Sequence, residues 1–227
     1  MKVFKFYNCE MEKIKMKKFF AHKIFKILKW VFLIIVGLYL ILVIVRVFHF
    51  INLDKTNAQV QKIHSTKITM GDVMGVNLPP DPGALADETV EGIDVNANGI
   101  RDDVELAIFE KYPDSAKTRA GLLQYALAQQ MQVIQPFVNT VIATEVIREH
   151  SRARSCLSGT LVPRKTRESF RSNLEMEKID EYISFMEDIQ LNTNERKEKR
   201  SLFFENLRSY SDLEGDKCDF DYSGLDN

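Results

Sequence analysis

The hydrophobic pattern divides this 227-residue chain into one long apolar run and a series of shorter amphipathic segments. Residues 30–45 are uncharged and nearly all large and apolar, and the apolar character continues after Arg46 to Ile51. A run of this kind, close to the roughly 20 residues that cross a bilayer, predicts a transmembrane helix over residues 30–51. No small-x-small cleavage site follows it, so an uncleaved signal anchor is favoured over a cleaved signal peptide.

Beyond this run, apolar residues recur at steps of three or four, which is the spacing of an amphipathic helix. A long helix is expected to begin near Ser115, and Pro136 should kink or divide it. Strand-like alternation is nearly absent, so the predicted fold is mainly α, with a helical domain of roughly 120–140 residues that can bury one core. The apolar stripes are Val104, Ala107, Ile108 and Tyr112; Leu123, Leu127, Met131, Ile134, Val138 and Val141, ending at Val146 and Ile147; Ile179, Tyr182, Ile183, Met186 and Ile189; and Leu202, Phe203, Leu207 and Tyr210, in a helix over about 194–210.

These elements divide the chain into five parts. A basic segment (1–29) precedes the signal anchor (30–51), and a stalk with a Pro/Gly-rich linker (52–92) follows it. A polar loop with its exit helix (93–112) then leads into a helical domain with an acidic C-terminal tail (113–227).

The formal net charge of −1 hides a strong asymmetry along the chain. Residues 1–29 contain nine lysines and only two acids, whereas the part beyond the apolar run has about nine more acids than bases. The positive-inside rule therefore predicts a single-pass protein of the bacterial inner membrane, with a cytoplasmic N-terminus and a periplasmic or extracellular C-terminal part. An acidic exported domain favours divalent cations over nucleic acid as ligands.

The most specific motif is the segment 94–105, which matches the twelve-residue calcium loop D-x-[DN]-x-[DN]-G-x5-E at every fixed position. Calcium takes six to eight oxygen ligands, and short oxygen-bearing side chains that alternate along a tight turn supply them. Gly99 stands where the turn needs a positive φ. The expected ligands of a bound Ca²⁺ are the side chains of Asp94, Asn96, Asn98, Asp102 and Glu105 and the backbone carbonyl of Ile100.

The alternative is an ordinary turn in which Asp102 and Asp103 cap the following helix. The segment also departs from a paired EF-hand. Position 8 of the loop is Arg101 rather than an aliphatic residue, the preceding proline-rich stretch cannot form an entering helix, and no second loop of this pattern occurs. A calcium sensor that opens on binding is therefore not expected.

The loop sequence resembles the EF-hand-like calcium loops of thrombospondin type 3 repeats and dockerin-like modules. With Leu-Pro-Pro-Asp-Pro-Gly at 78–83 before it and Tyr-Pro-Asp-Ser at 112–115 after it, the segment resembles a group of uncharacterised bacterial envelope proteins. Those proteins carry one such loop ahead of a helical domain, and the resemblance covers about residues 78–130. It implies calcium binding at the positions named above and implies no enzymatic activity.

The cysteines and histidines give weaker signals. Cys9 lies in the cytoplasmic segment, whereas Cys156 and Cys218 lie in the exported part, where disulfides persist. These two are expected to pair with each other, with free thiols as the alternative, and the spacing of Cys and His does not support a zinc site. The chain has no nucleophile elbow, Walker loop or zinc-protease motif, so His64 and His150 are not assigned as catalytic residues.

Two charged segments flank the predicted helices of the C-terminal half. The arginine-rich stretch 148–171 is expected to be a solvated, partly mobile connection between helices, with contact to an anionic lipid or glycan as the alternative. The acidic residues after position 211 are expected to form a solvated tail that Cys218 pins to the domain.

The sequence thus predicts a membrane-anchored envelope protein that binds one structural Ca²⁺ and acts through contacts with an envelope partner. The second hypothesis is an extracytoplasmic hydrolase that uses calcium only as a brace. The third is a subunit of a membrane complex whose transmembrane helix is the working part. Neither an enzymatic activity nor a nucleic-acid partner is expected from the motifs present.

Overall fold

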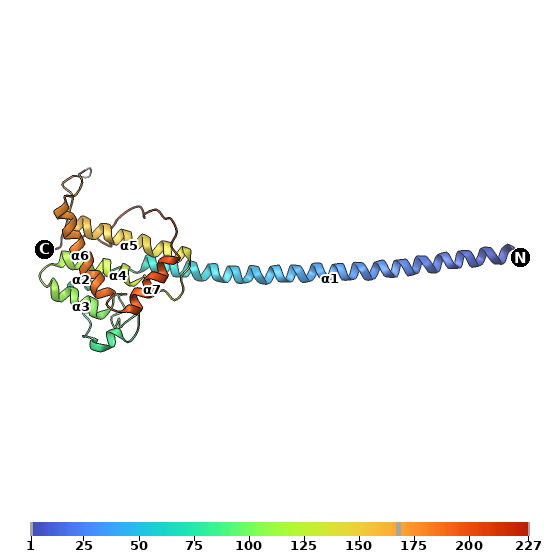
Figure 1. Ribbon diagram of the computed structural model, residues 1–227, viewed down its shortest axis with the longest axis horizontal. Coiled ribbons are helices and arrows are strands. Elements are labelled where there is room, and N and C mark those ends of the chain that lie inside the picture. Colours follow the sequence, from blue (N-terminus) through green and yellow to red (C-terminus); the bar gives the residue numbers. More distant parts are fainter. Residues whose placement is uncertain (1, 167–168, 227) are drawn as a thin grey trace. The chain divides into compact units, whose positions relative to one another are not determined.

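A computed structural model describes residues 2–166 and 169–226 and the side chains from residue 23 onward. The described residues contain only helices, turns and loops, without a strand, which confirms the mainly α prediction (Figure 1). The chain forms two compact units, Met1–Lys55 and Thr56–Asn227. The elements are α1 (Lys2–Ser65), α2 (Met70–Met74), the 3-10 helix η1 (Gly83–Asp87), α3 (Asp102–Lys111), α4 (Ala116–Gln130), α5 (Thr140–Leu161), α6 (Asn173–Gln190) and α7 (Asn194–Glu205).

The first unit consists of the part of helix α1 that ends at Lys55. Nearly all the large apolar side chains between residues 24 and 51 are exposed, including Trp30 at 67%. A helix that is apolar all round needs an apolar surrounding, because water would otherwise cover this surface. The part from Lys23 onward is long and apolar enough to cross a membrane. An apolar N-terminal helix is therefore confirmed, while its assignment as an anchor rather than a signal sequence stays a prediction.

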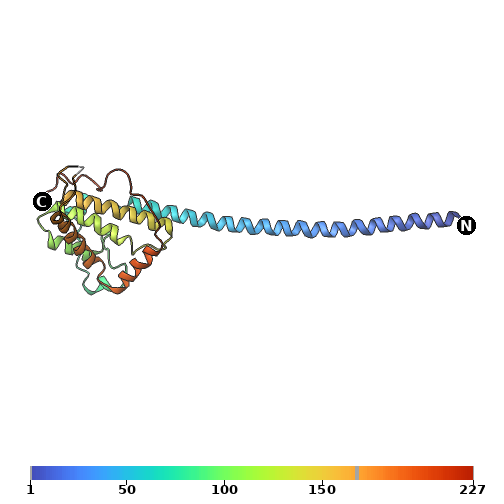
Figure 2. The same cartoon turned by 45° about the horizontal axis from the view of Figure 1, so that its top comes forward.

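The second unit is built around α4. Every residue of this helix except Lys117 is buried, because α5, α6, α3 and α2 all pack against it. Helix α5 runs alongside α4 in both views (Figures 1 and 2). The Ser115 hydroxyl caps α4 by accepting a hydrogen bond from the backbone N–H of Thr118. The helix start predicted near Ser115 is thus confirmed.

Pro136 divides two helices rather than kinking one. Helix α4 ends at Gln130, and α5 begins at Thr140 after its cap Asn139. Helix α5 then continues to Leu161, well beyond the predicted end of the apolar stripe at Ile147. The last helix, by contrast, ends at Glu205, before the predicted 210.

The arginine-rich stretch is not a mobile connection over most of its length. Residues 148–161 are helical in α5, and Arg152 is buried against Glu149 and Asp219. The prediction was wrong because the charge of Arg152 was taken as a sign of exposure, although paired arginines are tolerated in protein interiors. Part of the connection between α5 and α6, residues 167–168, lies outside the described residues.

Much of the segment that was predicted as stalk and linker packs into the second unit. Ile63, Ile68 and Val73 are at most 3% exposed and belong to its hydrophobic core. The short helix α2 has a complete capping box, in which the side chains of Thr69 and Asp72 each accept a backbone N–H of the other residue. These residues therefore contribute to the core of the second unit, and the C-terminal end of α1 belongs to that unit.

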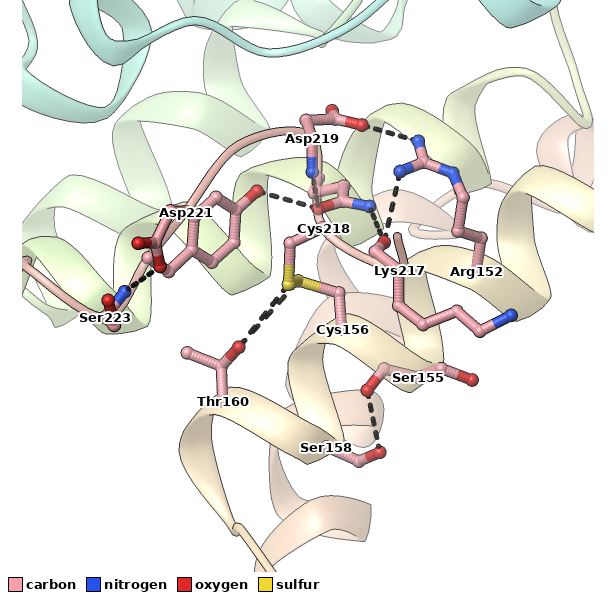
Figure 3. The surroundings of a disulfide bond; sticks show 12 residues. Arg152, Ser155, Cys156, Ser158, Thr160, Lys217, Cys218, Asp219, Asp221 and Ser223 are labelled. Atoms are coloured by element: carbon pink, nitrogen blue, oxygen red, sulfur yellow. Dashed lines mark hydrogen bonds and ion pairs between the residues drawn. A yellow bond between two sulfur atoms is a disulfide. The ribbon is translucent and has the colours of Figure 1, made fainter. Parts of the chain in front are cut away.

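The predicted pair of cysteines forms a disulfide. Cys156 of α5 and Cys218 of the C-terminal segment are joined, with their Cα atoms 4.9 Å apart (Figure 3). The C-terminal segment is not simply a solvated tail, because the Asp219 side chain is fully buried and Tyr222 is 3% exposed. A disulfide indicates an oxidising environment outside the cytoplasm for this unit.

Candidate metal centre

The predicted calcium loop is folded around its first carboxylate. Both oxygens of Asp94 accept backbone hydrogen bonds, one from Asn98 at 3.2 Å and the other from Gly99 at 2.9 Å. Gly99 has a φ of +88° and Ala97 a φ of +56°, so the chain makes the sharp turn that the motif predicts. The side-chain oxygen of Asn98 in turn accepts the N–H of Ile100 at 2.8 Å.

The loop closes where helix α3 begins. The backbone N–H of Asp102 donates to the Ile93 carbonyl at 2.8 Å, and both Asp102 carboxylate oxygens accept the N–H of Val95 at 3.1 and 3.2 Å. The expectation that Asp102 and Asp103 cap α3 is wrong, because the cap residue is Arg101 and makes no side-chain cap bond. Asp102 instead ties the end of the loop to its start. Burial raises the pKa of the Asp102 carboxyl, and the nearby Asp94 and Asp103 act in the same direction.

Glu105, the predicted bidentate ligand, points inward and is 1% exposed. Its Oε2 accepts hydrogen bonds from the side-chain amides of Asn96 at 3.0 Å and Asn98 at 3.1 Å. Three of the predicted ligand side chains, at loop positions 3, 5 and 12, therefore meet at one point. In the described part of the chain, Glu105 has no ion pair with a lysine, arginine or histidine that would balance its charge.

The pKa of Glu105 reflects this buried position. Burial raises it to about 7, and the charges of Asp72 and Asp102 act in the same direction, against the hydrogen bonds from Asn96 and Asn98. A carboxylate in this setting is relieved of its unfavourable charge either by a proton or by a cation. The loop thus holds a buried acid whose charge the surrounding protein does not neutralise.

The donor set fits a hard cation that prefers oxygen. The side-chain amides of Asn96 and Asn98 reach Glu105 with their nitrogens, while their oxygens accept the backbone N–H groups of Asn98 and Ile100. A half-turn of each amide would present its oxygen beside Glu105 but would give up these backbone hydrogen bonds. Asp94 is exposed and its carboxylate lies on the loop backbone, while Ile100 is fixed by its fully buried side chain. Among the described residues, no group of three or more His, Cys, Asp or Glu side chains is gathered as a metal site. The predicted shell therefore depends on amide and carbonyl oxygens as much as on carboxylates.

Arg101 joins the loop to α6 through contacts that the sequence did not reveal. Its side chain is 0% exposed and forms two bonds of 2.7 Å with the Asp103 carboxylate. It also donates to the carbonyls of Ile189 and Gln190, the last two residues of α6, at 2.9 and 3.1 Å. Loop position 8 in a paired EF-hand contacts a second loop, whereas here it contacts a helix end. The only signal in the sequence was an arginine where the pattern has an aliphatic residue.

Gly92 makes the approach of Arg101 possible. It has a φ of +70°, and a Cβ at this position would lie 2.3 Å from the Arg101 Cδ. The second buried arginine, Arg196 of α7, donates to the carbonyls of Ala86, Thr89 and Val90 in the segment before the loop. Both arginines therefore hold the loop region against α6 and α7.

A second polar cluster surrounds His64, which the sequence left without a role. Its Nδ1 lies 2.7 Å from a Glu149 oxygen and its Nε2 lies 3.1 Å from a Glu145 oxygen. Glu149 also pairs with Lys67 at 3.2 Å and with Arg152 at 2.7 Å. Burial by itself would raise the pKa of Glu149, but the hydrogen bonds and charges of these partners outweigh it and hold the pKa below its usual value.

The same cluster reaches the C-terminal segment beside the disulfide (Figure 3). Arg152 forms an ion pair with Asp219 and donates to the Lys217 carbonyl at 3.1 Å. The other Asp219 oxygen accepts the backbone N–H of Ile68 at 3.0 Å. The charges are paired with one another, so the cluster is well suited to joining distant segments of the domain.

His150 does not have the surroundings of a general base. Its Nε2 is buried without a hydrogen-bond partner, and its ring packs against Tyr125 with centroids 5.0 Å apart. Burial lowers its pKa to about 4, and the charges of Arg200 and Arg154 act in the same direction. The hydrolase hypothesis would be favoured by a pocket in which His150 faces Asp or Glu side chains. The described surroundings of His150 are instead a tyrosine ring and two arginines.

Comparison of the chain with models of protein families, with curated proteins and with solved structures gave no match. The resemblance to single-loop envelope proteins accordingly stays a prediction. The geometry itself shows a twelve-residue loop closed onto the start of α3, with the buried Glu105 at its centre.

Proposed function

We propose that this chain is a membrane-anchored protein whose folded unit lies outside the cytoplasm, binds one structural Ca²⁺ and contacts an envelope partner. The observation that supports the metal assignment is the buried carboxylate of Glu105, which meets Asn96 and Asn98 at the ligand positions of the loop and has no ion-pair partner among the described side chains. The Cys156–Cys218 disulfide and the apolar helix near the N-terminus support the location.

In this proposal the ion is held by Asp94, Asn96, Asn98, the Ile100 carbonyl, Asp102 and Glu105. The residues supply only oxygen, which matches the preference of calcium. Bound calcium would neutralise the carboxylates and hold the loop against the first turn of α3. Because only three ligands are acidic, we expect a dissociation constant on the order of 10⁻⁴–10⁻³ M, as in extracellular calcium modules.

Calcium titration of the full chain in detergent micelles tests the proposal. We expect calorimetry to show the binding of one ion, and we expect the melting temperature to be higher in millimolar calcium than in EDTA. Glu105→Gln should remove both, because the amide keeps the shape but removes the buried charge. Glu110→Gln is the matched control, since Glu110 is an exposed acid on the same helix.

Two outcomes contradict the metal assignment. The first is that wild-type protein shows no calcium-dependent shift at millimolar concentration. The second is that Glu105→Gln keeps the wild-type titration. An equal response to magnesium would contradict the choice of ion, because a site with this many oxygen ligands is better suited to calcium.

A further inference from the structure

A groove with both acidic and aromatic walls lies between α3 and α6, at the opposite end of α3 from the calcium-type loop. It encloses about 900 Å³ and opens widely to solvent. Its acidic side chains are Glu177, Asp180, Glu181 and Asp188, all exposed and all on α6. In the described part of the chain none of the four forms an ion pair. Lys111 is the one basic residue of the groove lining, which therefore carries a net negative charge.

Three half-buried aromatic rings distinguish this groove from an ordinary acidic surface. Tyr112, which follows α3, packs against Tyr182 and Phe185 of α6, with ring centroids 6.0 and 6.1 Å apart. The ammonium group of Lys111 lies 3.8 Å from the centroid of Phe185 and 5.8 Å from that of Tyr112. The ring of Phe185 thus already accepts an alkylammonium group of the chain itself.

These contacts identify the chemistry of a ligand. Aromatic rings contribute nothing to a hard metal ion, but they attract an alkylammonium group and cover its methylene stem. Carboxylates around the rings add charge complementarity. Positions 177, 180, 181 and 188 span about 16 Å of helix at 1.5 Å per residue, which is the length of about five extended residues. An extended peptide with lysine side chains matches this length and charge.

The groove walls are joined at the candidate metal centre. Helix α3 carries Asp102 and Glu105 in its first turn and ends at Lys111, beside the groove. The end of α6 is held by Arg101 of the loop. An ion that fixes the loop would therefore also fix the spacing of the two walls.

We propose that this groove is the docking site for a lysine-bearing segment of a partner protein. The proposal names the chemistry of the partner contact and rests on the interaction role proposed above. The lysines of the partner take the place of Lys111 on Phe185 and pair with the carboxylates of α6. Calcium in the loop strengthens the contact by holding α3 and α6 in register.

Fluorescence anisotropy with the full chain in neutral detergent and a labelled Lys-Ala-Lys-Ala-Lys peptide tests this. The control peptide has the same sequence with every lysine acetylated on Nζ. We expect saturable binding of the first peptide and none of the second. The double variant Glu181→Gln/Asp188→Asn should weaken binding by roughly tenfold, the equivalent of two moderate charge contacts. Lys111→Gln should tighten it, because the competing ammonium is removed.

The matched control is Glu195→Gln/Glu198→Gln, which removes two exposed acids of α7 outside the groove. Binding in this control should stay within about twofold of wild type, since exposed charges at a distance are screened. Equal loss in both double variants would show general electrostatic attraction and overturn the docking site. Competition by spermidine at the same concentration as the peptide would also overturn it, in favour of a free polyamine.

Calcium and EDTA arms separate this inference from the proposed function. A calcium-dependent melting shift without peptide binding leaves the metal site and removes the groove. Groove-dependent peptide binding that is the same in calcium, in EDTA and in Glu105→Gln leaves the groove and removes its coupling to the loop. Peptide binding that is several-fold tighter in calcium than in EDTA, and is lost in the groove variant, supports both.

Discussion

The contact between Arg101 and the end of α6 makes a sharp stability prediction for the substitution Arg101→Lys. Arginine here makes four hydrogen bonds, two to Asp103 and two to the carbonyls of Ile189 and Gln190. Lysine keeps the charge but has a single nitrogen without the planar fork, so it cannot reach the carboxylate and both carbonyls together. The carbonyls at the end of α6 would then lose their partners in a buried place.

The expected cost follows from the number of bonds lost. A hydrogen bond that involves a charged group contributes about 1.5–3 kcal/mol, and the loss of two of the four therefore destabilises the domain by about 3–6 kcal/mol. For a domain of 150–250 residues each kcal/mol shifts the melting temperature by about 2–4 °C. We expect Arg101→Lys to melt roughly 6–24 °C below wild type.

Near-ultraviolet circular dichroism of the full chain in detergent is the suitable assay. It follows the tyrosines of the folded unit, whereas the single tryptophan, Trp30, lies in the first unit. Arg154→Lys is the control, because Arg154 is an exposed arginine of α5. The decrease should appear in EDTA as well as in calcium, since the contact itself needs no ion. A melting temperature within 2 °C of the control would refute the role of Arg101.

Three further predictions concern the interior of the second unit. Replacing both Cys156 and Cys218 with serine should lower the free energy of unfolding by about 4 kcal/mol, because the disulfide closes a loop of 62 residues in the chain-entropy model. Denaturant titration measures this change, and an unchanged midpoint would contradict it. The pKa of His150 is about 4 in the folded state, below its unfolded value of about 6.5. The unfolded state therefore takes up the proton first as the pH falls. The contribution of His150 to stability is complete above pH 6.5, and the free energy of unfolding falls by up to about 3 kcal/mol as the pH drops to 4. The variant His150→Phe should flatten that part of the pH profile of melting, and a slope equal to wild type would assign the acid sensitivity to other groups. Gln129 is 3% exposed with both side-chain amide atoms unpaired, so Gln129→Met should raise the free energy of unfolding by about 1–3 kcal/mol; loss of stability in the same denaturant titration would show that the amide has partners in solution.

The local elements of this fold could be predicted from the sequence, because their signals are local. The cap at Ser115, the division at Pro136 and the apolar stripe of α6 all act within a few residues of themselves. The sharp turn of the loop could likewise be predicted from Gly99 and the Asp and Asn residues beside it. The pairing of Cys156 with Cys218 followed from the small number of exported cysteines.

What could not be predicted were the long-range contacts of charged residues. Arg152 and Asp219 are buried because they form an ion pair with each other across 67 positions of the chain. Arg101 is buried because it pairs with the nearby Asp103 and also donates to the distant carbonyls of Ile189 and Gln190. The spacing of apolar residues alone predicts that charged residues are exposed. For this reason the expectations for the arginine-rich stretch and the acidic tail were wrong. The stalk was mistaken for a spacer for a related reason, since Ile63, Ile68 and Val73 are too widely spaced to form a helical stripe.

The hydrogen bond from Ile68 to Asp219 joins residues 151 positions apart. Because residues 217–222 follow α7, a newly synthesised chain can complete this interior only after nearly the whole unit has been synthesised. Contacts of such separation form slowly and leave apolar surface open in the interval. We therefore expect the Ile68–Asp219 hydrogen bond and the Cys156–Cys218 disulfide to be among the last contacts to form as this unit folds.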